Sequence, residues 1–279
     1  MKVRIRTIQL LSFLWVAFFC LPSKAQPTIK KRAPFNIGER LTFDSKVLNE
    51  ERALNIYLPN GYDKASEKKY PVIYLLDGSK DEDFIHIAGL VQFGSFSWIN
   101  MIPETIVVGI ENVDRKRDFT FPSENTLDRE EFPTSGGSAK FIAFISEELQ
   151  PLIQKTYNVS EEKTIISQSL GGLLASEILH KKPALFNNYI IVSPSVWWDD
   201  NSILKMEPTM DSSKKIYVAG GTEGPAMQTG AVNLYYKLRE VYKDNGEVYY
   251  DFLKERDHGD ALHLAVYNAF EKLFVATKE

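Results

Sequence analysis

The chain has 279 residues, of which 44% are hydrophobic and 25% charged, a composition typical of a globular protein with a sizeable core. Its formal net charge of −4 disfavours nucleic acids and anionic membrane surfaces as partners. One cysteine and four histidines offer no cluster of zinc ligands, so we expect neither a metal nor a cofactor.

Residues 1–25 have the features of an export signal. Basic residues precede an apolar run over residues 8–21, and residues 23–25 form a small-x-small cleavage motif. The run is short for a membrane-spanning helix, although an uncleaved anchor is an alternative. Cleavage before Gln26 would remove the only cysteine and four basic residues, leaving 29 basic against 37 acidic residues and a net charge of −8. We expect a periplasmic or secreted protein without disulfides and without stable membrane insertion.

The rest of the chain divides into a polar arm, residues 26–38, and one domain, residues 39–279. Within the domain, short apolar or alternating runs predict strands, and apolar residues at helical spacing predict helices. The predicted strands are residues 40–47, 52–58, 70–76, 105–110, 164–166, 189–192, 216–219 and 248–253. The predicted helices are residues 83–101, 138–153, 171–180 and 229–243, with a last helix ending near residue 276.

Between residues 111 and 136 the chain is charged and irregular, which is often functional in a compact domain. Elsewhere, strands alternate with helices, and this order predicts an α/β fold with a mostly parallel sheet and helices on both faces. In such sheets, active sites lie beyond the carboxyl ends of the strands.

Ser169 lies between a β-branched strand and a helix that opens at Gly171-Gly172. This is most of the G-x-S-x-G nucleophile elbow, in which a tight turn lifts the serine hydroxyl above the sheet. The helix N-terminus that follows favours negative charge. Ser167 replaces the first glycine of the motif, and a serine- and glycine-rich loop without chemistry is the alternative.

A serine nucleophile needs a base and a third group that orients the base. His258 follows the last predicted strand, where an α/β-hydrolase carries its base. Glu223 follows the strand at residues 216–219 and is the predicted acid. The alternatives for the acid are Asp251, Glu255 and Asp257.

The tetrahedral intermediate of acyl transfer carries a negative oxygen that two backbone N–H groups should meet. Leu170, directly after the nucleophile, is predicted to supply one of these donors. Gly78, in the loop after the strand at residues 70–76, is predicted to supply the other because glycine permits close approach.

The chain resembles the esterase family of α/β-hydrolases that includes enterochelin and bacillibactin esterases, S-formylglutathione hydrolases and some feruloyl and acetyl-xylan esterases. The resemblance covers residues 39–275 and is greatest to the siderophore-esterase branch. It is carried by the blocks YLLDG, TIVVGIENVDRKRDF, GGSAKFIAFISEELQPLI, SQSLGGLLA, SPSVWW and DHG, in this order. The resemblance implies an α/β-hydrolase fold with Ser169 and His258 as nucleophile and base, and Gly78 and Leu170 as oxyanion donors. The resemblance also implies that the acid is not uniform, since some members of that branch work with a Ser–His dyad, and this leaves the role of Glu223 open.

Four further residues are candidates for substrate binding. Arg115 and Arg117 could pair with anionic groups, or could tie the irregular loop to Asp114 or Asp118. The other two, Trp197 and Trp198, could stack on a phenolic ring or cover the core.

We therefore predict a serine esterase that acts through an acyl-enzyme, with catecholate siderophore esters as the predicted substrate. Acetyl or feruloyl groups on polysaccharides, acyl transfer, and a binding module without catalysis are the alternatives.

Overall fold

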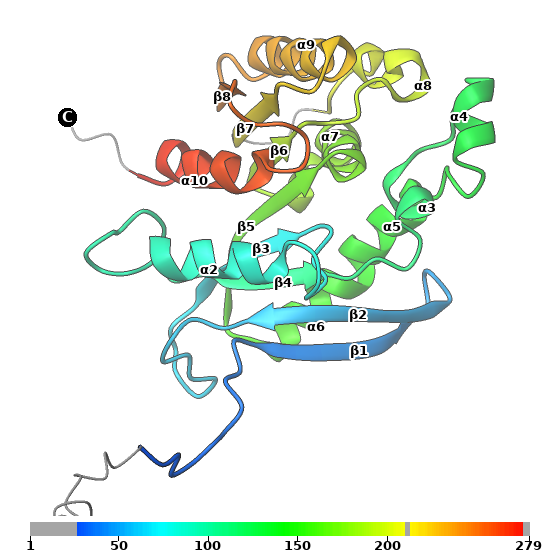
Figure 1. The fold of residues 1–279 in the computed structure, drawn as a ribbon. Helices are drawn as coiled ribbons and strands as arrows, with labels where there is room; N and C mark the ends of the chain where they lie inside the picture. The colour runs from blue at the N-terminus through cyan, green and yellow to red at the C-terminus, as the bar shows by residue number, and fades with distance from the viewer. Residues whose placement is uncertain (1–26, 210–212, 276–279) are drawn as a thin grey trace, which may run out of the picture. The chain divides into compact units, whose positions relative to one another are not determined.

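The computed structural model describes residues 27–209 and 213–275 (Figure 1). The predicted export signal lies outside these residues. Residues 27–36 are exposed and contain neither helix nor strand, and a separate compact unit begins at Ile37. No helix in the described part of the chain is long and apolar enough to cross a membrane.

Within these residues, eight strands form one sheet in the order β1-β2-β4-β3-β5-β6-β7-β8. The strands are β1 (Glu39–Ser45), β2 (Glu50–Tyr57), β3 (Tyr70–Leu75), β4 (Ile106–Ile110), β5 (Val159–Gln168), β6 (Asn188–Val192), β7 (Lys214–Gly221) and β8 (Gly246–Leu253). The β1–β2 and β2–β4 pairs are antiparallel, and every pair from β4–β3 to β7–β8 is parallel. The predicted mostly parallel sheet is confirmed.

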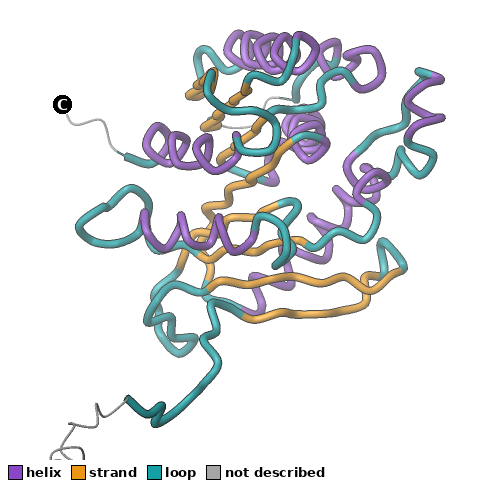
Figure 2. The backbone as a smooth tube through the Cα atoms, viewed as in Figure 1, coloured by secondary structure: helices purple, strands orange, loops and turns teal. Residues whose placement is uncertain are grey.

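Helices cover both faces of this sheet (Figure 2). The apolar residues of α2 and α10 pack into one core cluster, and those of α5, α6, α7 and α9 pack into the cluster on the opposite face. The helices are α2 (Phe84–Gly94), α3 (Arg115–Phe119), α4 (Thr126–Glu131), α5 (Ser138–Phe144), α6 (Gln150–Thr156), α7 (Leu170–Lys181), α8 (Trp198–Asn201), α9 (Pro225–Val241) and α10 (Ala261–Leu273), with a π segment at Ile145–Leu149 and 3₁₀ turns at Pro183–Leu185 and Ser202–Lys205. Strands buried on both faces need apolar side chains in both directions. This is why β4 and β6 are buried along their whole length.

The strand predicted at residues 164–166 is longer in the structure, as β5, and the helix predicted at residues 138–153 is divided by the π segment. Two other predicted elements also differ. The helix predicted at residues 83–101 is shorter, since α2 ends at Gly94. The Gly94 carbonyl accepts the N–H groups of Met101 and Ile102, at 2.8 and 3.2 Å, and these bonds fold the following segment back. The segment at residues 111–136 contains α3 and α4 and is less irregular than predicted.

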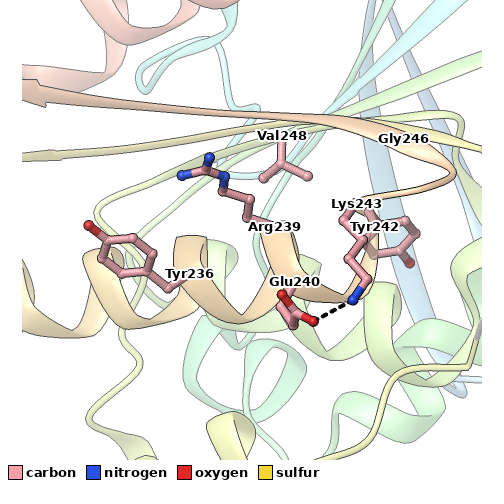
Figure 3. A pocket seen from close by; sticks show the side chains of 7 residues that line it. All are labelled: Tyr236, Arg239, Glu240, Tyr242, Lys243, Gly246 and Val248. Carbon is pink, nitrogen blue, oxygen red and sulfur yellow. Dashed lines mark hydrogen bonds and ion pairs between the residues drawn. The ribbon is translucent and has the colours of Figure 1, made fainter.

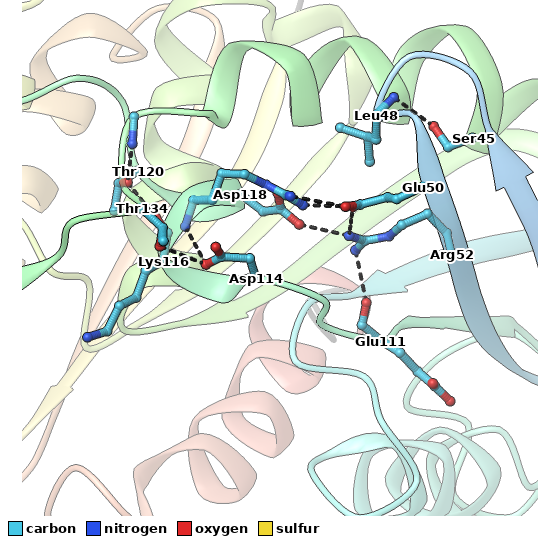
Figure 4. A network of polar contacts seen from close by, with 12 residues as sticks. Ser45, Leu48, Glu50, Arg52, Glu111, Asp114, Lys116, Asp118, Thr120 and Thr134 are labelled. Carbon is cyan, nitrogen blue, oxygen red and sulfur yellow. Dashed lines mark hydrogen bonds and ion pairs between the residues drawn. The ribbon is translucent and has the colours of Figure 1, made fainter.

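A buried network of charges ties the β1–β2 hairpin to α3 (Figure 4). Arg52 Nη1 donates to Asp118 at 2.8 Å and to Glu50 at 2.9 Å, and Arg52 Nη2 donates to the Glu111 carbonyl at 2.9 Å. The Arg52 side chain is fully buried and that of Asp118 is 2% exposed. Arg117 contacts the same two carboxylates. Because Arg52 and Asp118 are buried together, removing either charge leaves the other buried with less compensation and should lower the free energy of unfolding.

We expect Arg52→Met to lower the free energy of unfolding by about 3–5 kcal/mol, because Asp118 stays buried with less compensation. The matched control is Arg40→Met, which removes a half-exposed pair with Glu111 and should lower the free energy of unfolding much less. Urea unfolding measures both. Equal losses in the two variants would contradict the stabilising role assigned to the buried network.

Candidate active site

Ser169 occupies the one-residue turn between β5 and α7. Its backbone has φ 60° and ψ −123°, a conformation that residues other than glycine rarely adopt. The neighbouring strand β6 and its loop hold the turn, since the Ser169 N–H donates to the Val192 carbonyl at 3.1 Å and the Ser195 N–H donates to the Ser169 carbonyl at 3.0 Å. Ser167 fits where the motif has glycine because its buried hydroxyl donates to the Ile190 carbonyl at 3.1 Å.

The small residues after Ser169 let the helix approach its neighbours. A Cβ on Gly172 would lie 2.9 Å from the Cα of Pro194, closer than real Cβ contacts. Helix α7 therefore starts directly above the sheet, and the N–H of its first residue, Leu170, has no acceptor within the helix.

His258 and Glu223 are joined by a hydrogen bond of 2.6 Å between Nδ1 and Oε2. The Glu223 side chain is 3% exposed, whereas that of His258 is 46% exposed. The other carboxylate oxygen of Glu223 accepts from the Gly221 N–H at 2.8 Å and from the Ser193 hydroxyl. Burial would raise the pKa of Glu223, but the hydrogen bonds from His258, Ser193 and Gly221 lower the pKa below its ordinary value. An ionised Glu223 that accepts Nδ1–H leaves the His258 Nε2 free to accept a proton.

Two cavities meet at Ser169 and His258. The larger cavity, of about 690 Å³, is lined by Ser169, Ser195, Trp197, Thr222, Glu223, Met227, Asp257 and His258. The smaller cavity, of about 380 Å³, is lined by Asp77, Glu82, Asp83, Arg115, Gln168, Ser169, His258 and Gly259. A bound ester could therefore place one part on each side of the serine.

Another cavity, of about 570 Å³, lies between α9 and the start of β8 (Figure 3). Its lining includes Arg239 and the ion pair between Lys243 and Glu240. It contains none of the predicted site residues.

The alternative acids have other partners. Asp251 accepts from the Tyr217 hydroxyl at 2.8 Å and from the Asn268 amide at 3.2 Å. Asp257 accepts the Gly259 N–H at 2.8 Å within its own loop. The structure therefore places the side chain of Glu223, the predicted acid, in hydrogen-bond contact with His258.

The two predicted substrate-binding arginines have protein partners. Arg115 lines the smaller cavity, but its guanidinium forms a fork with Asp77, at 2.6 and 2.9 Å, rather than a pair with Asp114 or Asp118. Arg117 pairs with Glu50 and Asp118 in the buried network and lines neither cavity at Ser169. The Arg117 guanidinium thus follows the predicted alternative, a tie to Asp118, and also holds the hairpin through Glu50, whereas substrate binding by Arg117 stays an untested prediction.

The two tryptophans divide between site and core. Trp197 lines the larger cavity beside Ser169. Trp198 is fully buried and its indole N–H donates to the Phe121 carbonyl at 2.9 Å. A fully buried ring cannot stack on a ligand, so Trp198 follows the other predicted alternative and covers the core.

Gly78 has a structural use that conflicts with the predicted oxyanion role. Its N–H donates to the Ile110 carbonyl at 3.0 Å, which occupies the donor. A Cβ on Gly78 would lie 2.4 Å from the Cα of Gly109. The glycine is thus required because two backbones cross here, and its N–H is not free to meet a substrate oxygen.

Sequence reasoning missed three polar residues of the site. Ser193 donates to Glu223, the Ser195 hydroxyl lies 3.5 Å from that of Ser169, and the Gln168 amide donates to the His258 carbonyl. The two missed serines follow β6 directly, so their place at the carboxyl end of a buried strand was the signal available in the sequence.

Comparisons with known proteins concern the family and the fold of the chain. Residues 45–259 match the family model described as "Putative esterase". The chain is 35% identical over 169 residues to the ferri-bacillibactin esterase BesA of Bacillus subtilis, an alignment that covers 56% of this chain and 58% of that relative. Among solved structures, the IroE-like serine hydrolase from Shewanella oneidensis has a TM-score of 0.76 and 27% identity, covering 85% of this chain and 80% of that one. The BES protein from Bacillus cereus has a TM-score of 0.78 and 26% identity, covering 90% and 100%.

We expect Ser193→Ala to raise the pKa of Glu223, because the variant removes a hydrogen bond to the carboxylate. Carboxyl carbon NMR over a pH titration measures this change. The matched control is Ser195→Ala, whose hydroxyl contacts Ser169 instead and should leave the pKa of Glu223 in place. A pKa of Glu223 that is unchanged or lowered in Ser193→Ala would contradict this assignment.

The same change should make stability depend less on pH. The folded-state pKa of Glu223 lies below the unfolded value of about 4.3, so this carboxylate stabilises the fold above that pH and ceases to do so as the pH falls through the folded-state pKa. Ser193→Ala should therefore destabilise the protein at neutral pH more than in acid.

Proposed function

Because this chain belongs to the esterase family that its residues 45–259 match, we propose that it is a serine esterase that cleaves carboxylic esters through an acyl-enzyme. In this proposal Ser169 is the nucleophile, His258 is the base and Glu223 orients the base. The observation that carries the proposal is the 2.6 Å bond from His258 to a buried carboxylate, beside a serine held at φ 60° in the turn before a helix.

Acylation begins when the Ser169 Oγ attacks the ester carbon and its proton passes to His258 Nε2. The charge that forms on the former carbonyl oxygen is met by the Leu170 N–H at the start of α7. The C–O bond to the alcohol then breaks, and the alcohol leaves with the proton from His258. A water molecule repeats the sequence on the acyl-enzyme and releases the acid. Glu223 stabilises the imidazolium that forms at each step.

We further propose that the substrate is a siderophore ester. This is the class of substrate that the name of the similar ferri-bacillibactin esterase gives. The larger cavity supports this choice because Trp197 and Met227 offer an aromatic and an apolar surface to a catechol ring.

The smaller cavity favours a second candidate. It carries Asp77, Glu82 and Asp83, and burial together with the charges of Asp77 and Glu82 raises the pKa of Asp83 to about 6. Arg115 also lines this cavity, but its guanidinium is paired with Asp77. Glu82 and Asp83 remain to repel an anionic ferric complex and to accept hydrogen bonds from hydroxyl groups. An acetyl or feruloyl ester on a sugar would suit this side of Ser169.

A panel of substrates separates these candidates. We expect the purified protein, without added metal, to hydrolyse short aryl esters and a catecholate triester, and to react with a fluorophosphonate probe. Turnover of acetylated or feruloylated xylo-oligosaccharides without any activity on catechol esters would replace the siderophore proposal and keep the esterase. A wild-type protein that neither hydrolyses esters nor reacts with the probe would be a binding module.

We expect Ser169→Ala and His258→Ala each to lower kcat by several powers of ten, roughly 10⁴-fold or more, with little further loss in the double variant, because the groups act as a unit. Glu223→Gln should lower kcat by about 10³- to 10⁴-fold, since an amide does not stabilise the imidazolium. Ser146→Ala, whose hydroxyl bonds the Ala143 carbonyl within its helix, is the control. If the losses in kcat of the two single variants multiply in the double variant, Ser169 and His258 do not act as a unit. A kcat of Glu223→Gln near that of the wild type would indicate a Ser–His dyad.

We also propose that the protein is exported. Expression of the full chain should give a periplasmic or secreted form that begins at Gln26, as read by N-terminal mass spectrometry. An exported form that retains Met1 would show an uncleaved anchor instead.

A further inference from the structure

Gln168, the residue before Ser169, reaches from the elbow to the histidine loop. Its side-chain Nε2 donates to the backbone carbonyl of His258 at 2.6 Å. Gln168 also lines the smaller cavity together with Ser169 and His258. We propose that Gln168 is a positioning residue that fixes the base relative to the nucleophile. This inference rests on the proposed roles of Ser169 and His258.

The histidine loop has few other ties to the elbow. Its bonds at Asp257 and Gly259 are local, with Asp257 N–H donating to Asp260 at 2.8 Å and Gly259 N–H donating to Asp257 at 2.8 Å. Thr222 ties the start of the loop to the end of β7, by donating to the carbonyls of Arg256 and Lys254 at 2.7 Å each, but these bonds do not reach the elbow. The His258 side chain is 46% exposed, so packing constrains it weakly. The bond to Glu223 fixes which ring nitrogen carries the proton, but one bond at Nδ1 leaves the ring free to pivot about it. A second tether, on the backbone of the same residue, fixes the point from which the side chain extends, so that the two bonds together limit where the ring can lie.

Gln168 is suited to this task because its own backbone is fixed. The Gln168 carbonyl accepts from Arg115 Nη2 at 3.3 Å, and the Arg115 guanidinium is held by the fork to Asp77. A chain of contacts thus runs from the loop after β3, through the elbow, to the loop after β8. Since Gln168 and Ser169 are consecutive, a tether from one to His258 sets the distance from the other to the imidazole.

The chemistry of the amide explains why this residue is glutamine. The acceptor is a carbonyl oxygen, so the amide nitrogen must face it, and a carboxylate of the same shape would repel it. An uncharged donor also leaves the charge balance between Glu223 and His258 undisturbed. Misplacing a catalytic group by about 1 Å can cost about a hundredfold in rate.

The test compares three variants of the full chain. Gln168→Met keeps the length of the side chain and removes the donor. Gln168→Glu keeps the shape but can donate only when its carboxyl is protonated. Gln154→Met, at an exposed position on α6, is the matched control for the glutamine-to-methionine change.

On a short aryl ester we expect Gln168→Met to lower kcat about tenfold to a hundredfold, with KM within about twofold of wild type. Its rate relative to wild type at the same pH should stay constant, because only the donor is lost. The same ratio for Gln168→Glu should rise as the pH is lowered from about 8 to about 5, because protonation restores a donor. A purely structural role would not produce this pH-dependent difference between the variants.

A second readout does not need activity. Hydrogen exchange of the segment at residues 254–260 should be faster in Gln168→Met than in Gln154→Met. A kcat of Gln168→Met within about twofold of wild type, a change in KM alone, or equal pH ratios for the two Gln168 variants would overturn the proposal. If Ser169→Ala retains full activity, the proposed function fails, whereas unchanged exchange in Gln168→Met refutes the tether alone.

Discussion

At Ser169 the chain leaves a buried strand and enters a buried helix within one residue. No gradual turn fits, because the strand is paired with β6 on one side and the helix lies against Pro194 on the other. The backbone is held at φ 60°, a conformation that costs about 1–3 kcal/mol for a residue other than glycine. Hydrogen bonds with Val192 of β6 and with Ser195 in the loop after it, together with the burial of α7, offset that cost. The turn also carries the contacts of Gln168 with the His258 carbonyl and of Ser169 with the Ser195 hydroxyl.

Charged residues connect this turn to the antiparallel edge of the sheet. Three charged residues in the stretch that begins at Asp114 make different contacts. Asp114 caps α3 by accepting the Arg117 N–H at 3.0 Å, Arg115 donates to Asp77, and Asp118 accepts from Arg52. A stretch that looks like a loop for anionic ligands is thus mainly a clamp between the site and the β1–β2 hairpin. The charged side chains of this stretch mainly pair with other charged groups of the protein, which lets those groups be buried, and do not mainly bind a ligand.

Local patterns predicted the fold well. Apolar runs marked the buried strands, and the alternation of strands with helices gave the parallel sheet and its two covered faces. The same logic put Ser169, Glu223 and His258 at one edge, where the structure brings them together, although their catalytic roles are still proposals.

The errors came from contacts between residues distant in sequence. Whether Trp198 or its neighbour faces the cavity depends on the Phe121 carbonyl, and whether the Gly78 N–H is free depends on Ile110. The length of α2 depends on bonds from Met101 and Ile102 to Gly94. A tight turn or a ring has the same sequence signature whether its polar atoms are free or paired. Gln168 was missed for the same reason, since its partner lies in a loop 90 residues away.

The strand that carries the histidine loop is at the border of the sheet. Within the described residues β8 pairs with β7 alone, and most of its residues are only half-buried. Border elements of this kind open in local fluctuations at lower free energy than the core. His258 therefore belongs to a part of the fold that loosens early, whereas Ser169 belongs to a part that loosens last. On warming, the proposed enzyme would lose its base while its nucleophile is still in place, so that inactivation precedes global unfolding.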